Sequence, residues 1–82
     1  MAWVYMLFSS QNRKTYTGST TNLERRLAEH NSGKHAYTKR YVPWVVVYKE
    51  EVAELKTARS REKYLKSAAG RRFIKRQDII PR

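Results

Sequence analysis

The feature that most constrains the fold is a run of apolar and aromatic residues near the N-terminus, AWVYMLFS at 2–9. A short run that is apolar almost throughout is typical of a β-strand buried on both faces. The polar residues at 10–13 predict a turn, and KTYTG at 14–18 predicts a second strand because Thr and Tyr favour strands. The chain is therefore expected to begin with a β-hairpin.

A helix is expected to follow the hairpin. Thr21 and Glu24 have the spacing of a capping box, in which each side chain caps the backbone amide of the other residue. Gly33 suits the left-handed position that follows a helix C-terminus, so we expect the helix to end there. Residues 34–43 then form a basic loop that contains tyrosines.

The remaining residues predict one strand and two helices. WVVVY at 44–48 predicts a strand, which the acidic pair at 50–51 is expected to end. Apolar residues at helical spacing predict a second helix over about 52–69, broken by Gly70. A short last helix is expected over 71–78. The order β-β-α-β-α-α predicts an α+β fold in which helices flank a small three-stranded antiparallel sheet.

The length of the turn decides whether the two hairpin tyrosines share a face of the sheet. A four-residue turn at 10–13 places Leu7 opposite Tyr16 and Tyr5 opposite Gly18. Since side chains alternate along a strand, both phenols then lie on one face, whereas a turn one residue longer would separate them. Two ordinary strand tyrosines with hydroxyls at the rim are the alternative interpretation.

Composition limits the class of protein. The 82 residues are expected to form a single domain over 1–82. Eighteen Lys and Arg against seven Asp and Glu give a net charge of +11, which favours a polyanionic partner such as DNA or RNA over a merely soluble basic protein. The chain has no cysteine, which excludes disulfides and cysteine zinc sites. We expect no membrane segment or secretion signal, and a cytoplasmic location.

Several short motifs together point to a known family. They are Trp-Val-Tyr at 3–5, Tyr-Thr-Gly at 16–18, RRLAEH at 25–30, NSGKHAYTKR at 31–40 and a later glutamate, Glu62. In these motifs and their spacing, nearly the whole chain resembles the GIY-YIG nuclease superfamily, above all its small single-domain bacterial members. The first tripeptide departs from Gly-Ile-Tyr and the second has Thr17 at its centre, both at positions expected to serve the scaffold.

The resemblance implies hydrolysis of phosphodiester bonds with one divalent ion, Mg²⁺ or Mn²⁺. It implies that Tyr16 or Tyr5 helps to activate water, that Arg26 steadies the phosphate, that His30 supports the site and that Glu62 holds the metal. A free phenol ionises only near pH 10, whereas histidine titrates near neutral pH. His30 is therefore a second candidate for the general base, and the sequence leaves Tyr16 and His30 both open.

The position of Arg26 independently supports binding of an anion. It lies four residues after Asn22 and four before His30, so the three side chains share one edge of the expected helix. That edge begins at the helix N-terminus, where free amides favour a phosphate, and a guanidinium can bind a phosphate through two hydrogen bonds. The alternative is that Arg26 pairs with Glu29 or Asn22 on a solvated face.

Glu62 interrupts the apolar stripe of the second expected helix, which includes Ala58 and Leu65. An inward-facing carboxylate is unfavourable unless it is paired or bound to a metal. The other carboxylates are placed elsewhere, so the chain offers one ligand for one ion rather than a two-metal site. The alternative is an ordinary i,i+4 ion pair with Lys66 on the surface.

The basic loop and the second helix supply the expected nucleic-acid surface. Phosphate contacts and base stacking are expected from Lys34, His35, Tyr37, Lys39, Arg40 and Lys66. The leading hypothesis is a metal-dependent DNA endonuclease with little sequence specificity, acting on branched or damaged DNA in repair or recombination together with other repair proteins. A non-catalytic nucleic-acid-binding domain on the same scaffold is the alternative, and a basic protein-interaction adaptor is a third.

Overall fold

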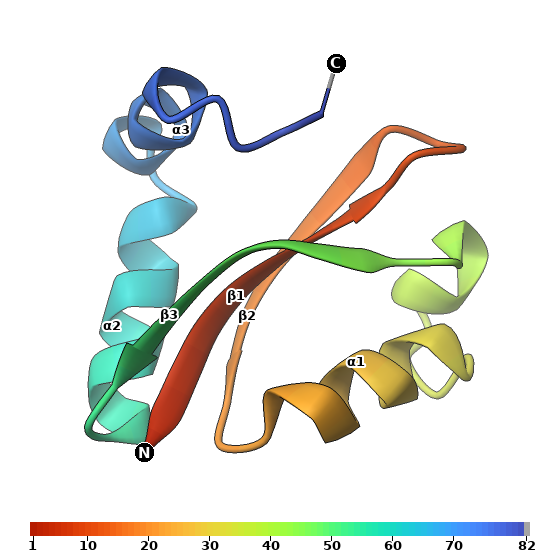
Figure 1. Ribbon diagram of the computed structural model, residues 1–82, viewed down its shortest axis with the longest axis horizontal. Helices are drawn as coiled ribbons and strands as arrows, with labels where there is room; N and C mark the ends of the chain where they lie inside the picture. The colour runs from red at the N-terminus through yellow and green to blue at the C-terminus, as the bar shows by residue number, and fades with distance from the viewer. Residues whose placement is uncertain (82) are drawn as a thin grey trace.

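The computed structural model describes residues 1–81 and has an α+β fold, as predicted (Figure 1). A three-stranded antiparallel sheet is combined with three α-helices and a short 3₁₀-helix, η1, over this part of the chain. In chain order the elements are β1 Ala2–Ser9, β2 Lys14–Thr20, α1 Leu23–Asn31, η1 Thr38–Tyr41, β3 Val45–Val52, α2 Leu55–Leu65 and α3 Ala68–Arg76. No helix among these is long and apolar enough to cross a bilayer.

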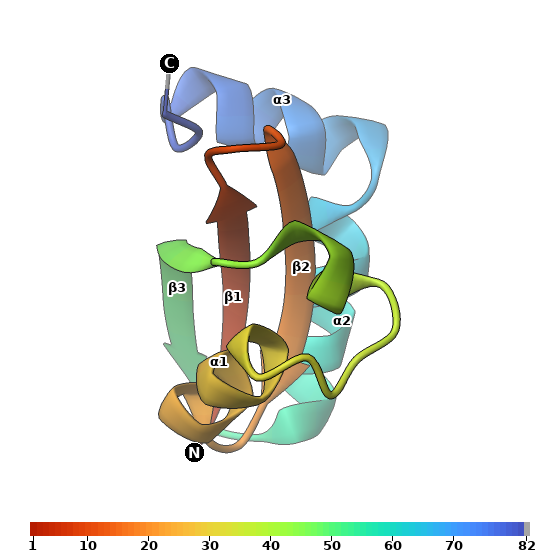
Figure 2. The same cartoon turned by 90° about the vertical axis from the view of Figure 1, so that its right-hand side faces the viewer.

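The strand order β2-β1-β3 explains the apolar run at the N-terminus. β1 is the central strand and pairs antiparallel with both neighbours. Helices cover both faces of the sheet: α1 and η1 lie on one face, and α2 and α3 lie on the other (Figures 1 and 2). Every residue of β1 except Trp3 is therefore buried. β2 is left as an edge strand, and this edge positions the candidate site.

The predicted register of the hairpin is confirmed. Leu7 pairs with Tyr16 and Tyr5 pairs with Gly18, joined by a turn at 10–13. Both tyrosine side chains consequently lie on the face covered by α1, where Tyr5 and Leu7 form a core cluster with Trp44. The alternate residues of β1 point to the other face, where Met6 lies near Leu65 and Ile74.

The N-terminus of α1 differs from the predicted capping box. Asn22, not Thr21, is the N-cap, and its side-chain oxygen accepts a hydrogen bond of 3.0 Å from the Arg25 amide. The reason lies at the end of β2, where the buried Thr20 hydroxyl accepts a bond of 3.1 Å from the Asn22 amide and delays the start of the helix. The predicted end is confirmed, since Gly33 follows α1 with a left-handed φ of 85°.

The acidic pair at 50–51 does not end the third strand, which continues to Val52. Pairing explains the difference, because Val4 and Trp3 of β1 lie opposite Glu50 and Glu51. The Glu50 carboxylate is neutralised by Arg61 of α2, with N–O distances of 3.0 to 3.2 Å, and also accepts a hydrogen bond from the Tyr48 hydroxyl.

The predicted helix break at Gly70 is also wrong. The chain turns at Lys66 and Ser67, Ser67 caps α3, and Gly70 lies inside α3. Gly70 is needed for close packing, since a Cβ there would lie 2.3 Å from the Tyr64 carbonyl oxygen and 2.4 Å from the Leu65 Cα. The glycine allows α3 to cross the end of α2 rather than terminating a helix.

Candidate active site

The two hairpin tyrosines form the centre of the candidate site. Their ring centroids are 6.4 Å apart. Gly18, opposite Tyr5, makes room for them: a Cβ at this position would lie 2.6 Å from the Tyr5 hydroxyl and 3.0 Å from the Tyr16 ring. Tyr5 is buried, whereas Tyr16 is partly exposed and lines a surface groove. Of the two phenols, Tyr16 is therefore the one that a substrate can approach.

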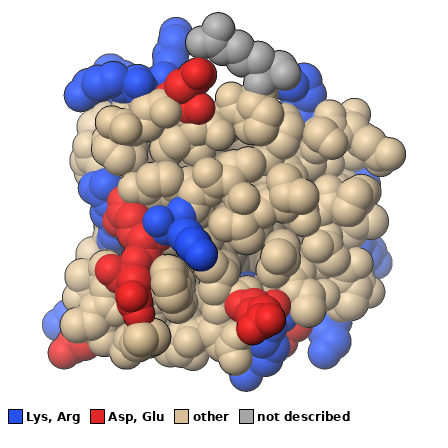
Figure 3. Space-filling view, in the orientation of Figure 1, with Lys and Arg blue, Asp and Glu red and all other residues tan. Residues whose placement is uncertain are grey.

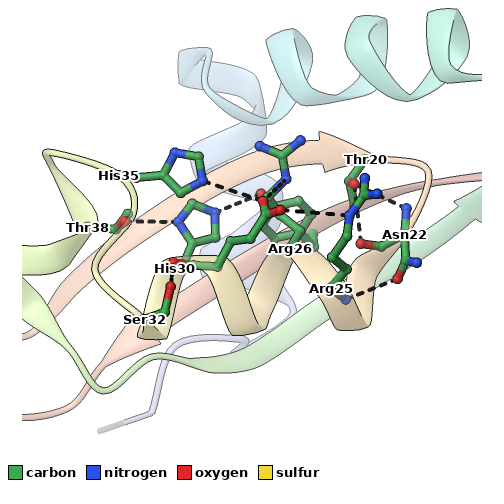
Figure 4. Close-up of polar contacts among 10 residues, drawn as sticks. Thr20, Asn22, Arg25, Arg26, His30, Ser32, His35 and Thr38 are labelled. Atoms are coloured by element: carbon green, nitrogen blue, oxygen red, sulfur yellow. Dashed lines mark hydrogen bonds and ion pairs between the residues drawn. The ribbon is translucent and has the colours of Figure 1, made fainter.

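His30 is buried at the C-terminal end of α1 (Figure 4). Its Nε2 lies 3.1 Å from the Tyr5 hydroxyl, and its Nδ1 lies 2.9 Å from the Thr38 hydroxyl of η1. The Tyr16 ring packs against the imidazole at a centroid distance of 4.7 Å. Both ring nitrogens thus have a partner, and His30 holds Tyr5 in place.

Burial sets the protonation states of this pair. Burial, with smaller contributions from His35 and Arg26, lowers the pKa of His30 from 6.5 to about 4. Burial, followed by the neighbouring Tyr16, raises the pKa of Tyr5 above its ordinary value. At neutral pH His30 is therefore uncharged and Tyr5 keeps its proton.

Arg26 projects from α1 near the same centre, and its charge opposes the rise in the pKa of Tyr5. Its Nε lies 3.5 Å from Glu29 Oε1, and His35 Nε2 lies 3.7 Å from the same oxygen. Both nitrogens are buried, and neither has a hydrogen-bond partner within residues 1–81. Arg26 Nε and His35 Nε2 thus face the same carboxylate oxygen of Glu29 at distances at or beyond the limit of a hydrogen bond.

Glu62 approaches from the other face of the sheet, around the free edge of β2. Ser19, next to Gly18 on β2, donates a hydrogen bond of 2.7 Å from its hydroxyl to Glu62 Oε1. Lys66 donates one of 2.7 Å to Oε2. The carboxylate is near enough to Tyr5 to contribute to its raised pKa. The side chain is 22% exposed, so it faces the sheet edge and also forms the i,i+4 pair.

The basic loop borders the site, but its residues differ in position. Tyr37 is 50% exposed and its ring lies 6.4 Å from that of Tyr16. Lys34, Lys39 and Arg40 are exposed. His35, in contrast, stacks on His30 at a centroid distance of 4.6 Å and points to Glu29.

Comparison with known proteins shows the family of the chain. Residues 1–76 match the family model described as the GIY-YIG catalytic domain. The chain belongs to the GIY-YIG family. It is 40% identical over 74 residues to a UPF0213 protein of Staphylococcus haemolyticus, covering 89% of each chain. It is 42% identical over 66 residues to a UPF0213 protein of Natronomonas pharaonis, covering 79% of this chain and 76% of the relative. No solved structure gave a significant match.

The GIY-YIG family is a nuclease family that acts on nucleic acid and generally uses divalent metal ions. Within residues 1–81 no group of three or more His, Cys, Asp or Glu side chains forms a preassembled metal site. Glu62 nevertheless fits one hard cation, because its partly exposed carboxylate can be completed by water and substrate phosphate oxygens. Lys66 now occupies one of its oxygens and would have to move.

Thr38 and Ser19 were not assigned a role from the sequence, and Glu29 was named there only as an alternative partner of Arg26, a pairing that the structure contains. Thr38 positions His30, Ser19 orients Glu62, and Glu29 holds Arg26 and His35. Thr38 lies within the NSGKHAYTKR motif, so a signal for it was present. The role of Ser19 depends on β2 meeting α2, a contact between residues 43 positions apart that no local pattern reveals.

Proposed function

We propose that this GIY-YIG protein is a metal-dependent endonuclease that hydrolyses phosphodiester bonds of DNA with little sequence specificity. The observation that supports the proposal is that Tyr16, Arg26 and Glu62 all lie close enough to Tyr5 for their charges to act on it, beside the edge strand β2. A phosphodiester at this edge can touch side chains from both faces of the sheet. Branched or damaged DNA, in repair or recombination and together with other repair proteins, is the setting we propose.

Each side chain has a role that its position supports. The Arg26 side chain is 32% exposed and its Nε lies 3.5 Å from Glu29, so its guanidinium can turn to bind a phosphate oxygen instead. Tyr16 reaches the surface groove, and we assign its Oη, in the ionised phenolate form, to accept the proton of the attacking water. As the water oxygen bonds to phosphorus, the P–O bond to the leaving oxygen breaks, and that oxygen takes up a proton from solvent to leave as a hydroxyl.

The buried pair acts as support. Tyr5 retains its proton and is fixed by neutral His30, so these residues hold the pocket and orient Tyr16 rather than exchanging protons with solvent. We therefore favour Tyr16 over His30 as the general base. Glu62 would hold a single Mg²⁺ or Mn²⁺, which as a Lewis acid supplies stabilisation of charge on the phosphate.

Basic side chains around the site support binding of the DNA backbone. Figure 3 shows Lys and Arg mainly along the edges of one face of the molecule. We propose phosphate contacts by Lys34, Lys39 and Arg40, stacking by Tyr37, and a second phosphate contact by Lys66 once it leaves Glu62. His35 would help to position the anion together with Arg26. Phosphate contacts carry no base information, which is the reason for proposing low sequence specificity.

One observation favours the alternative, a nucleic-acid-binding domain without catalysis. Both oxygens of Glu62 have partners, Ser19 and Lys66, so the carboxylate is stable without a metal. A domain that has lost catalysis would keep the same basic surface.

Nicking of supercoiled plasmid in Mg²⁺ or Mn²⁺ separates these functions. Arg26→Ala, Glu62→Gln and Tyr16→Phe are each expected to lower the nicking rate at least about 100-fold, the scale of a lost transition-state donor or general base. Arg25→Ala is the matched control for Arg26, because Arg25 is the exposed neighbour on α1, and it should retain near-normal nicking. DNA binding by wild type without metal-dependent nicking would establish the alternative, and full activity of Tyr16→Phe would exclude the phenol as base.

A further inference from the structure

A groove of about 830 Å³ runs along the edge strand β2 beside α3, and it is lined from both faces of the sheet. Its floor is apolar and includes Met6, Ile74 and Ile79. In Figure 2, α3 lies across the end of the sheet where the β1–β2 turn is found. The volume is in the range of pockets that bind small ligands, and so suits a few nucleotides rather than a duplex.

The lining of the groove combines two kinds of chemistry. Its cationic residues are Lys66, Arg71 and Lys75, and all three are exposed. Its aromatic residues are Tyr16 and Tyr37. Asp78 also lines the groove, and its side chain or backbone interacts with another group of the protein. Cationic side chains and aromatic rings around one apolar floor can bind phosphates and unpaired bases at the same time.

The groove leads directly into the candidate active site. Tyr16 is the proposed base and Lys66 is bonded to the proposed metal ligand, Glu62, and both side chains line the groove. A DNA strand lying in the groove would therefore continue to the position proposed for the cleaved phosphodiester bond. This continuity connects a ligand of the groove with the substrate of the site.

We propose that the groove binds a single-stranded segment of DNA that flanks the cleaved bond, so that the preferred substrate joins duplex and unpaired DNA. The inference rests on the proposed nuclease function and deepens it. Paired bases are stacked inside a duplex and cannot reach an apolar floor, whereas unpaired bases can stack on Tyr37 and cover Ile74. Arg71 and Lys75 then contact the phosphates of that strand.

Fluorescence anisotropy in EDTA tests the inference without cleavage. The probes are a labelled blunt duplex and the same duplex with a short single-stranded overhang. Wild type is expected to bind the overhang probe more tightly. The double variant Arg71→Ala/Lys75→Ala should lose this preference. For the overhang probe, the slope of log affinity against log salt concentration should become about 1.4 less steep, because each of two lost single-strand phosphate contacts contributes about 0.7 to the slope.

Arg72→Ala/Arg76→Ala is the matched control. These arginines lie on the same helix and are exposed, their removal changes the charge equally, and neither lines the groove. The control should weaken both probes alike and keep the preference. Tyr37→Ala should weaken overhang binding about fivefold or more, and Tyr37→Phe should preserve it because the ring remains. Melting curves of all variants confirm that they fold.

Three results would overturn the inference. The first is that wild type binds both probes equally. The second is that Arg71→Ala/Lys75→Ala and Arg72→Ala/Arg76→Ala lose the overhang preference to the same extent. The third is that the protein forms a concentration-dependent dimer which Arg71→Ala/Lys75→Ala abolishes. The last would show that a second copy occupies the groove. In each of these cases, plasmid nicking that still depends on Arg26 would leave the nuclease proposal standing. Conversely, a preference for the overhang probe without any nicking would count against the proposed nuclease activity and in favour of single-strand binding in the groove.

Discussion

Replacing Gly18 with alanine tests the packing on which the candidate site depends. The added Cβ would lie 2.6 Å from the Tyr5 hydroxyl oxygen, 2.8 Å from Tyr5 Cζ and 3.0 Å from a ring carbon of Tyr16. Tyr5 cannot move outward easily, because it is 1% exposed and bonded to His30. The substitution therefore has to displace Tyr5 within a packed core.

Two terms give the expected size of the effect. Overpacking a core costs about 1–3 kcal/mol. Moving the Tyr5 hydroxyl also breaks the 3.1 Å hydrogen bond and leaves the buried His30 Nε2 without its partner, which costs about 1–3 kcal/mol more. We expect the free energy of unfolding to fall by about 3 kcal/mol. At about 4–8 °C per kcal/mol for a domain of this size, the melting temperature should fall by more than about 10 °C.

Urea and thermal unfolding followed by tryptophan fluorescence measure this change. Tyr5→Phe removes the closest contacting atom, so in the Gly18→Ala background it should be much less destabilising than in wild type. Gly33→Ala is the control: its φ of 85° makes alanine unfavourable, but the nearest atom to the new Cβ is 3.7 Å away, and Tyr5→Phe should not compensate for it. Additive effects of Gly18→Ala and Tyr5→Phe, or a melting temperature unchanged in Gly18→Ala, would refute the reasoning.

Two further predictions concern charge. The unfolded chain binds a proton on His30 near pH 6.5 and the folded chain only near pH 4, so the free energy of unfolding should fall as pH falls through this interval, by up to about 1.4 kcal/mol per pH unit. Urea unfolding at several pH values measures this, and the His30→Gln variant should lack this part of the pH dependence. An identical pH dependence in wild type and His30→Gln would contradict the prediction. Lys66→Met should tighten Mn²⁺ binding at Glu62, measured by electron paramagnetic resonance, by about 1.4- to 5-fold, because an exposed ion pair is worth about 0.2–1 kcal/mol. The control for Lys66→Met is Lys63→Met, which removes an exposed charge next to Glu62 in the sequence. Unchanged Mn²⁺ affinity in Lys66→Met would show that Lys66 does not compete with the ion.

The hairpin and its register could be predicted because both depend on neighbours in the sequence. The alternation of side chains and the turn at 10–13 are sufficient to place Tyr5 and Tyr16 on one face. The family motifs, in turn, drew attention to Arg26, His30 and Glu62. Local patterns were less successful at the ends of elements. The N-cap at Asn22 depends on the Thr20 hydroxyl, and the position of Gly70 depends on how closely α3 crosses α2.

By itself, then, the sequence determined the order of strands and helices, the shared face of the two tyrosines and the excess of positive charge, because each follows from periodicity or composition. The tertiary structure decided that His30 is enclosed between Tyr5 and Thr38, and that Glu62 reaches the edge of β2 between Ser19 and Lys66. These contacts join residues from different elements. Burial and hydrogen bonding across such contacts, rather than any residue type alone, set which groups are charged and which can reach a substrate.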